Sequence, residues 1–546
     1  MRPASRVSVP DLLRTASRSL ESGRHADGAK ALRQALDLAP NAAAVVGAMA
    51  QLTTLARTWL MLGQAPIALA SLAPLAQSEH AGAAVMALYG QALLAVGCKA
   101  DAEAAFRAWL QKDPHHKDAA LQLASVLADE GKSAEAETLV RGAIARHGVT
   151  VETAFVLGRT LLGLARFDEA EAEFRYVVRS QPNHQMAQAN LMELVWMRCG
   201  DVHESSRAID DALLAQPQLG GLRITKSRLL LSARMPREAL AELEAGMAIA
   251  PRDPALLAAA SAVALEFDGS KALDYARRLQ EASSPRDRAA RIALGKAYLA
   301  TGRGCDALEI AEAIHLSNPS DGQALALKAD ALRMLGDGRY CELFDYQNLV
   351  HAELIDVPEG WVNREAYVSE LVDDLVRLHV LKAHPIGNSL REGSQIPLVP
   401  ADSSFPSIRA FPRAIDGPVH RYIQKMGRGN DPMRRRNTGR YEINGIWSVR
   451  LRPHGFHVNH YHPGGWISSV CYLSLPPAVQ RRGEGWLKFG EPAFPTAPAL
   501  GPEYFLRPAP GLLVLFPSYM WHGTVPFSGG EHDSRMTIAF DAIPGG

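Results

Sequence analysis

The sequence contains few cysteines and no long apolar run. Its five cysteines lie far apart and form no Cys-x-x-Cys pair; they are Cys98, Cys199, Cys305, Cys341 and Cys471. This spacing argues against a disulfide framework or a cysteine zinc site and indicates a reducing compartment. No stretch of eighteen apolar residues exists and no signal-peptide pattern follows Met1, so neither a membrane span nor secretion is expected. We therefore expect a cytoplasmic protein.

An excess of either charge is also missing. The 58 Lys and Arg residues balance the 58 Asp and Glu residues, which gives a formal net charge of zero. This balance indicates neither a nucleic acid nor a membrane surface as partner of the whole chain. The 546 residues exceed what one hydrophobic core holds, so two or three domains are expected. The sequence does not indicate the oligomeric state.

Small residues recur at intervals of 33 to 35 residues through the Ala- and Leu-rich first two thirds of the chain; they are Ala68, Ala102, Ala136, Ala170, Ser205, Ala239, Ala272, Ala307 and Cys341. Five residues before several of them stands a glycine, at Gly63, Gly97, Gly131, Gly200, Gly302 and Gly336. Twelve residues after several stands a proline, at Pro114, Pro182, Pro217, Pro251 and Pro319. Gly28 and Pro40 extend the pattern towards the N-terminus, with a longer gap before Ala68.

Two helices and two short turns consume roughly 34 residues, which accounts for this interval. Glycine ends the first helix, the small residue allows close helix approach, and proline ends the second helix. Residues 8–345 resemble tetratricopeptide repeats, with nine or ten units forming an all-α superhelix. The concave groove of such a superhelix typically binds a protein or peptide. A spacer or a self-association module is the alternative.

The composition changes after residue 345, so residues 346–546 are predicted to form a second domain with a helical lead-in, including residues 367–375. From Pro385 onward, Pro, Gly, aromatic and β-branched residues predominate. Strands are predicted at 446–451, 467–473, 511–516 and 536–540. Short strands without intervening helices favour an antiparallel sandwich or barrel.

Histidines are concentrated in this second domain. His460 and His462 are two residues apart, so on a strand their side chains point to the same side and can face one metal ion. His522, at the end of an apolar strand, is the candidate third ligand. His454 and His457 are expected near the mouth of the site or behind the ligands. A structural histidine cluster is the alternative to a metal site.

Arg535 and Thr537 follow His522 and share one face of a predicted strand. Arginine grips a carboxylate through two hydrogen bonds, and a neighbouring hydroxyl adds another. A 2-oxoglutarate oxygenase requires a metal with three protein ligands and open coordination positions, next to a group that binds a carboxylate. A surface ion pair is the alternative for Arg535.

The segment from about 385 to 544 resembles the bacterial 2-oxoglutarate/Fe(II) oxygenases that often follow tetratricopeptide repeats. The matching pieces are residues 388–395, His460-Tyr461-His462-Pro463, 466–473, 485–492, 510–522 and 534–540. The resemblance implies a double-stranded β-helix, or jelly roll, and Fe(II) as cofactor. It also implies oxidation of 2-oxoglutarate to succinate with hydroxylation of an unactivated C–H bond. The Tyr472 hydroxyl is a further candidate for binding the co-substrate, although a core aromatic is the simpler interpretation.

One position departs from the wider superfamily, because His462 stands where a carboxylate ligand is usual. A carboxylate from elsewhere, such as Glu484 or Asp533, is one way to supply the missing charge. The sequence thus favours an Fe(II)- and 2-oxoglutarate-dependent oxygenase that acts on a protein or peptide engaged by the repeats. The alternatives are a three-histidine, cupin-like dioxygenase without a keto acid, and a repeat scaffold with an inert β-domain.

Overall fold

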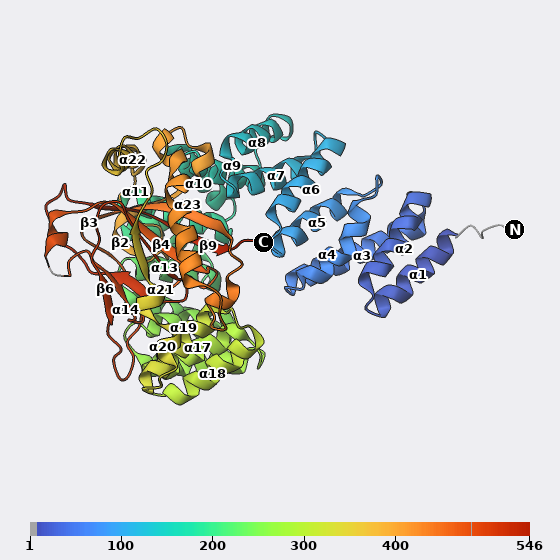
Figure 1. Ribbon diagram of the computed structural model, residues 1–546. Helices are drawn as coiled ribbons and strands as arrows, with labels where there is room; N and C mark the ends of the chain where they lie inside the picture. The colour runs from blue at the N-terminus through green and yellow to red at the C-terminus, as the bar shows by residue number, and fades with distance from the viewer. Residues whose placement is uncertain (1–7, 482) are drawn as a thin grey trace. The chain divides into compact units, whose positions relative to one another are not determined.

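The computed structural model describes residues 8–481 and 483–546, and the chain divides into two compact units (Figure 1). The first unit ends at Gln181 and the second begins at Pro182. The first unit consists of helices that pack as consecutive pairs. They are α1 (Val9–Glu21), α2 (His25–Leu38), α3 (Ala43–Met61), α4 (Ala65–Ala76), α5 (Ala83–Ala95), α6 (Lys99–Lys112), α7 (Lys117–Asp129), α8 (Ser133–His147), α9 (Val151–Gly163) and α10 (Phe167–Ser180).

Helix pairs of the same kind open the second unit. They are α11 (Gln185–Cys199), α12 (Val202–Ala215), α13 (Gly220–Ser232), α14 (Pro236–Ile249), α15 (Pro254–Ala264), α16 (Gly269–Ala282), α17 (Arg288–Ala300), α18 (Gly304–Ser317) and α19 (Gly322–Met334). Each helix packs against the next one along the chain. The structure therefore confirms an array of two-helix repeats.

The small residues of the 34-residue pattern lie on the second helix of successive pairs. From Ala68 to Ala307 every one of them is buried, as a close contact between helices requires. Cys341 differs, because it is exposed on the four-residue helix α20 (Tyr340–Leu343) and has no full helix around it. The long gap before Ala68 has a simple cause, since α3 has 19 residues.

The glycines and prolines of the pattern lie in the turns between the helices. Each of the six turn glycines has a φ between 67° and 85°, the left-handed conformation that glycine adopts without strain. The five prolines lie two residues beyond the ends of α6, α10, α12, α14 and α18. At the corresponding turns of two other repeats, Ala165 and Arg234 adopt a positive φ without being glycine.

The close packing of helices in the first unit can be tested at Gly90. A Cβ added there would lie 2.2 Å from the Phe106 ring on α6, so Gly90→Ala is expected to lower the free energy of unfolding by about 1–3 kcal/mol. Gly47→Ala on α3 is the control, since no described atom lies within 4 Å of the added carbon. The control is expected to raise stability by about 0.5–1 kcal/mol. Urea unfolding measures both variants, and equal stability of the two would contradict this packing.

The strands of the second unit form two antiparallel sheets. The six-stranded sheet has the order β1-β7-β4-β9-β3-β2, and the three-stranded sheet has the order β6-β5-β8. The strands are β1 (His351–Leu354), β2 (Leu390–Leu398), β3 (Tyr441–His457), β4 (Ile467–Ser474), β5 (Leu487–Phe489), β6 (Tyr504–Leu506), β7 (Leu512–Pro517), β8 (His522–Thr524) and β9 (Arg535–Pro544). All four predicted strands are present, and the predicted antiparallel β-domain is confirmed; two sheets of this kind are compatible with a jelly roll.

Two longer helices pack on the large sheet. Helix α22 (Arg364–Leu378) contacts β4 and contains the predicted helical segment, and α23 (Pro406–Met426) contacts β1 and β7. Helix α23 precedes the first of the four predicted strands and was not predicted from the sequence. Pro412 and Pro418 lie inside this helix, and proline is unfavourable in a helix interior, so the sequence did not indicate a helix here. Its apolar residues nevertheless recur every three or four positions, as in an amphipathic helix. Shorter elements are α21 (Tyr346–Leu349) and the 3-10 turns η1 (Pro400–Asp402), η2 (Arg434–Arg436) and η3 (Pro477–Gln480).

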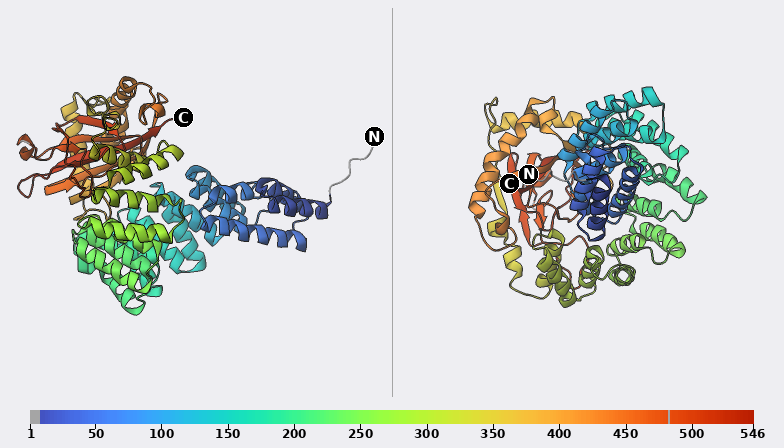
Figure 2. Two further views of the ribbon diagram at one scale, coloured as in Figure 1. Left: turned by 90° about the horizontal axis from the view of Figure 1, so that it is seen from below. Right: turned by 90° about the vertical axis from the view of Figure 1, so that its right-hand side faces the viewer.

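Repeats and strands share one hydrophobic core within the second unit. This core runs from Leu230 on α13 to Ala542 on β9, and Figure 2 shows the green helices beside the red and orange strands. The predicted boundary near residue 345 falls inside this unit, between the last long repeat helix and β1, and stays a prediction. Among the described residues, no helix combines the length and the apolar character needed to cross a bilayer.

Candidate functional site

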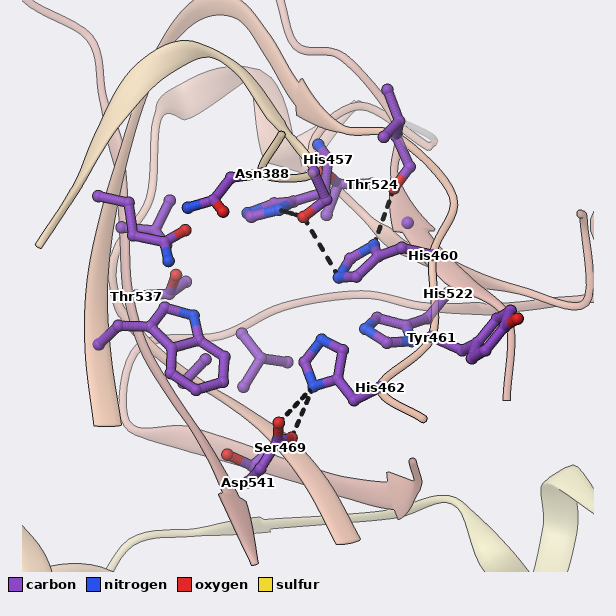
Figure 3. A pocket seen from close by; sticks show the side chains of 18 of the residues that line it. Asn388, His457, His460, Tyr461, His462, Ser469, His522, Thr524, Thr537 and Asp541 are labelled. Carbon is purple, nitrogen blue, oxygen red and sulfur yellow. Dashed lines mark hydrogen bonds and ion pairs between the residues drawn. The ribbon is translucent and has the colours of Figure 1, made fainter. Parts of the chain in front are cut away.

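A cavity of about 640 Å³ opens between the two sheets. Its lining includes residues of β2, β3, β4, β7 and β9 of the large sheet and of β5 and β8 of the small one. His460, His462 and His522 lie at one side, and Thr537 lies at the opposite side (Figure 3). The cavity therefore collects most of the residues that the sequence singled out.

Backbone pairing brings the first and third histidines together. His460 and His522 are opposite each other in an antiparallel bridge, with an N–H···O distance of 2.9 Å in both directions. The His462 amide donates to the Ser518 carbonyl at 2.7 Å, which holds the next turn of the chain in place. A separation of 62 residues in sequence thus becomes direct contact in the fold.

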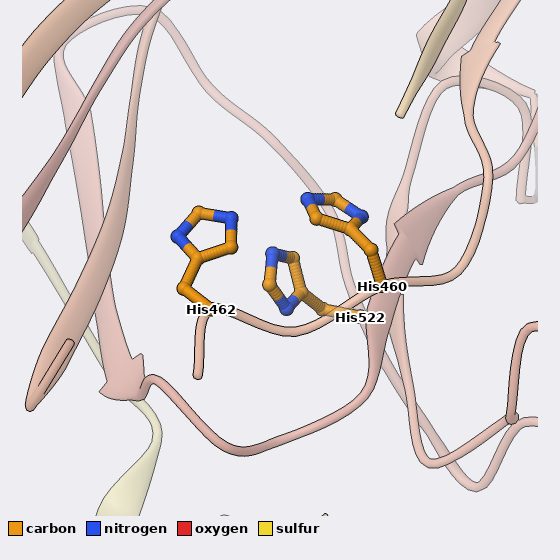
Figure 4. Close-up of side chains that lie close together, drawn as sticks. All are labelled: His460, His462 and His522. Atoms are coloured by element: carbon orange, nitrogen blue, oxygen red, sulfur yellow. The ribbon is translucent and has the colours of Figure 1, made fainter. Parts of the chain in front are cut away.

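The three imidazoles surround one point (Figure 4). One ring nitrogen of each histidine lies within 4.8 Å of one on both others. The ring centroids are 4.2 Å apart for His460 and His522, and 5.2 Å apart for each pair that includes His462. These three side chains could hold a metal ion.

Each ring has a hydrogen-bond acceptor at Nδ1. His460 Nδ1 donates to the Val458 carbonyl at 2.8 Å, and His522 Nδ1 donates to the Met520 carbonyl at 2.9 Å. His462 Nδ1 donates to the Asp541 carboxylate at 2.6 Å. Because carbonyl and carboxylate oxygens only accept, these bonds place the proton on Nδ1 and leave the Nε2 lone pair available. Histidines that ligate metals almost always have such a partner behind them.

Burial keeps the rings of His460 and His522 neutral. Desolvation lowers the pKa of His460 to about 3, and it lowers the pKa of His522 well below its ordinary value. The neighbouring imidazoles act in the same direction, since each would repel a second positive charge. A neutral imidazole is the form that ligates a metal.

His457 lies behind His460, and burial lowers its pKa well below the usual range too. The Ser389 hydroxyl joins the two rings, 2.9 Å from His457 Nδ1 and 3.3 Å from His460 Nε2. An ion bound to His460 Nε2 would replace the longer of these two interactions. His457 lines the cavity, whereas His454 does not, so only one of the two histidines expected near the site belongs to its wall.

Four residues of β9 line the cavity at alternate positions, as a strand requires; they are Arg535, Thr537, Ala539 and Asp541. Arg535 is only 1% exposed, and its guanidinium lies 4.9 Å from the centre of the Tyr472 ring. Among the described residues, no carboxylate forms an ion pair with it, and its Nε and the Tyr472 hydroxyl have no hydrogen-bond partner. Burial accordingly lowers the pKa of Arg535 from its usual range.

An unpaired buried guanidinium is unfavourable unless a ligand supplies the missing anion. The Arg535 guanidinium is therefore suited to a carboxylate that enters the cavity, whereas Tyr472, whose ring lies beside this guanidinium, does not line the cavity. Thr537, which is buried on the same face of β9, adds a hydroxyl to this wall. The chemistry of this wall fits the far carboxylate of a keto acid, and the carboxylate clamp itself stays a prediction.

The carboxylate of this site comes from Asp541, which sequence reasoning missed. Glu484 accepts hydrogen bonds from the Ser528 amide and hydroxyl, and Asp533 accepts one from the Gly530 amide, so both are engaged in loops outside the cavity. Asp541 instead contacts His462 with both oxygens, at 2.6 and 2.7 Å, and also accepts from the Ser468 hydroxyl. The sequence did contain a signal for Asp541. Side chains two residues apart on a strand point to the same face, and Asp541 follows Arg535 by six residues, so the two share one face of that strand.

Residues 445–541 match the model of a protein family described as "Putative 2OG-Fe(II) oxygenase". The match contains the three histidines and, on β9, Arg535 and Asp541. It confirms the resemblance of this part of the chain to 2-oxoglutarate/Fe(II) oxygenases. Comparison of the sequence with curated proteins gives no match.

Solved structures similar to this chain include two that are described as tetratricopeptide-repeat proteins. One is from Parabacteroides merdae, at 14% identity over 47% of this chain and 98% of that one, with a TM-score of 0.34. Yeast Tom70 is similar at 13% identity over 63% of this chain and 85% of that one, with a TM-score of 0.36. A thermophilic repeat protein of Thermus thermophilus is 19% identical over 34% of this chain and 100% of that one, with a TM-score of 0.27.

Proposed function

We propose that the second unit catalyses an Fe(II)- and 2-oxoglutarate-dependent oxygenation. The observation that carries this proposal is the pairing, in one cavity, of three imidazoles with available Nε2 atoms and a buried arginine without an anion. His460, His462 and His522 would hold Fe(II), and Arg535, with Thr537, would hold the far carboxylate of 2-oxoglutarate, while the Tyr472 ring lies beside the guanidinium. The family match of residues 445–541 supports the same chemistry.

The reaction converts substrate R–H, O2 and 2-oxoglutarate into R–OH, succinate and CO2. Bound Fe(II) would activate O2, and oxidative decarboxylation of the keto acid would supply two of the four electrons that O2 accepts. The C–H bond supplies the other two. The protein's own contribution is to hold three neutral ligands, to orient the keto acid through Arg535, and to enclose both between the sheets.

Asp541 supplies the negative charge that a three-histidine site otherwise lacks. The usual ligand set of two histidines and a carboxylate carries one negative charge. Here the Asp541 carboxylate accepts a hydrogen bond from the His462 ring and would act on a bound ion through that ring. Such a partner raises the basicity of the imidazole and fixes its orientation.

Two variants of Asp541 measure this contribution. We expect Asp541→Ala to weaken metal binding by about 10–100-fold, because His462 loses both its orientation and its charge partner. Asp541→Asn keeps a hydrogen-bond acceptor without the charge, so its loss is expected to be smaller. Anaerobic titration of each variant with Fe(II) measures the affinities. Wild-type affinity in Asp541→Ala would contradict the assigned role.

Binding and turnover assays of the full chain test the function. Protein loaded with Fe(II) without oxygen is titrated with 2-oxoglutarate, and the visible charge-transfer band of a keto acid chelated to Fe(II) is recorded. Oxygen is then admitted, and succinate is measured by NMR. We expect the band, and succinate that depends on Fe(II), O2 and 2-oxoglutarate together.

Other results would point to the alternatives. Iron binding without affinity for 2-oxoglutarate would overturn the proposal and favour the three-histidine dioxygenase. Failure to bind iron would leave the repeat scaffold with an inert β-domain.

We further propose that the substrate is a polypeptide engaged by the repeats of the first unit, α1 to α10. Repeat surfaces of this kind commonly bind peptides. In the second unit part of the repeat surface is covered by the chain itself, since Trp196 Nε1 on α11 donates to the His384 carbonyl at 2.8 Å and the Lys382 amide donates to the Met197 carbonyl at 2.9 Å. Peptide arrays incubated with the complete system and read by mass spectrometry test this. Gain of one oxygen atom is expected, and oxygenation of small metabolites but of no peptide would contradict it.

A further inference from the structure

We propose that the last repeat helices, α17 and α19, position the metal ligands, so that the metal centre is completed by the repeat array. This inference rests on the proposed metal site. It starts from the sequence neighbours of the three histidines. Trp521, Tyr461 and Pro463 each stand next to one or two of them, and each contacts α17 or α19. The three contacts differ in kind and are described in turn.

The first contact is a hydrogen bond to the residue before His522. Trp521 Nε1 donates to Asp330 Oδ2 on α19 at 2.8 Å, and both side chains are only 3% exposed. Burial raises the pKa of the Asp330 carboxyl to about 8. A polar group buried to this extent is costly unless it is hydrogen-bonded, so the Trp521 indole has one strongly preferred position. The backbone at His522 follows from that position.

The second contact involves the residue between His460 and His462. The Tyr461 ring lies against Trp521, with centroids 4.5 Å apart in an edge-on arrangement. Lys296 on α17 places its ammonium 5.8 Å from the centre of the same ring. A cation over an aromatic face is attractive, and more so away from water. Helix α17 thus contacts the short segment that carries two candidate ligands.

The third contact is steric and concerns the residue after His462. Gly322 is the first residue of α19, and a Cβ added there would lie 2.7 Å from the Pro463 carbonyl oxygen and 2.9 Å from its Cα. Backbone atoms cannot move aside as a flexible side chain can. The start of α19 therefore sets the position of the chain just beyond His462.

Together these contacts account for two ionisable side chains, Lys296 and Asp330, beside a mainly apolar interface. Burial lowers the pKa of Lys296 and raises that of the Asp330 carboxyl, and apolar residues of similar size would pack at least as well at both positions. Directional contacts to Tyr461 and Trp521 are what these two side chains add. They make Asp330 and Lys296 positioning residues for the histidines.

Metal affinity, rather than activity, tests this role. The full chain and its variants are titrated anaerobically with Co(II), whose visible spectrum reports the ligand geometry, at a temperature well below each variant's Tm. Asp330→Ala removes the acceptor of the Trp521 indole, and we expect about tenfold weaker binding with an altered spectrum. Asp330→Asn retains an acceptor oxygen and is expected to restore the affinity.

Gly322→Ala is the second variant, and Gly220→Ala is its matched control. Both glycines begin a repeat helix of the second unit, but a Cβ at Gly220 would meet only the Leu256 side chain, at 3.3 Å. We expect about tenfold weaker Co(II) binding for Gly322→Ala and wild-type binding for Gly220→Ala. If Asp330→Ala does not fold, this pair decides alone.

The outcomes separate the inference from the proposed function. A wild-type chain that binds no Co(II) or Fe(II) would overturn the metal site itself. A wild-type chain that binds, with unchanged affinity and spectrum in folded Gly322→Ala and Asp330→Ala, would overturn only the role of the repeats. Equal losses in Asp330→Asn and Asp330→Ala would also contradict positioning through the indole hydrogen bond.

Discussion

His522→Ala is expected to bind Fe(II) more than about 100-fold more weakly than the wild-type chain and to form no succinate above background. The reason is geometric. His522 shares a backbone bridge with His460 and presents an Nε2 atom whose orientation the Met520 carbonyl sets. Removal of this ring leaves two imidazoles, of which only His462 has a charged partner.

Anaerobic Fe(II) titration and succinate measurement check this expectation, with thermal unfolding as the test of integrity. His532→Ala serves as control, because His532 is exposed in the same β-domain and does not line the cavity. The control is expected to retain both affinity and turnover. Full metal affinity in a folded His522→Ala chain would remove His522 from the ligand set and with it the proposed centre.

The histidine pair shows what spacing in a sequence can establish. His460 and His462 are two residues apart, and their rings meet that of His522, although the predicted strand is wrong: His460 forms an isolated bridge and His462 lies outside the strands. The repeat pattern is predictable because a small residue, a glycine and a proline at constant offsets describe the length of two helices. Both patterns are spacings along the chain, which a sequence carries directly.

Asp541 and Asp330 show where such reasoning stops. Asp541 is placed on His462 by the register between β4 and β9, in which Ser468 lies opposite Asp541. Asp330 contacts Trp521 across 191 residues of sequence, because a repeat helix packs on the β-domain. Neither contact follows from residue spacing, since both depend on how distant elements meet. The helix α23 was missed for a different reason, because its two prolines are typical of loops.

Arg535→Met is expected to separate stability from function. The KM for 2-oxoglutarate should rise by at least about 100-fold, because two charge-assisted hydrogen bonds, each worth about 1.5–3 kcal/mol, disappear. Stability without the keto acid should stay the same or increase, since the wild-type chain buries a guanidinium that has no anionic partner among the described residues. Methionine can occupy much of the same space without a charge.

Thermal unfolding with and without 2-oxoglutarate measures both effects at once. At a concentration 100 times its Kd, the keto acid should stabilise the Fe(II)-loaded wild-type chain by about 2.7 kcal/mol, and the same concentration should stabilise Arg535→Met by no more than about 0.4 kcal/mol. Arg535→Lys is the graded control: it keeps the charge but not the two-pronged geometry, so its KM should fall between those of the other two. A variant that unfolds at lower temperature without ligand would instead identify Arg535 as a structural residue. Undiminished stabilisation of Arg535→Met by 2-oxoglutarate would place the co-substrate carboxylate elsewhere in the cavity.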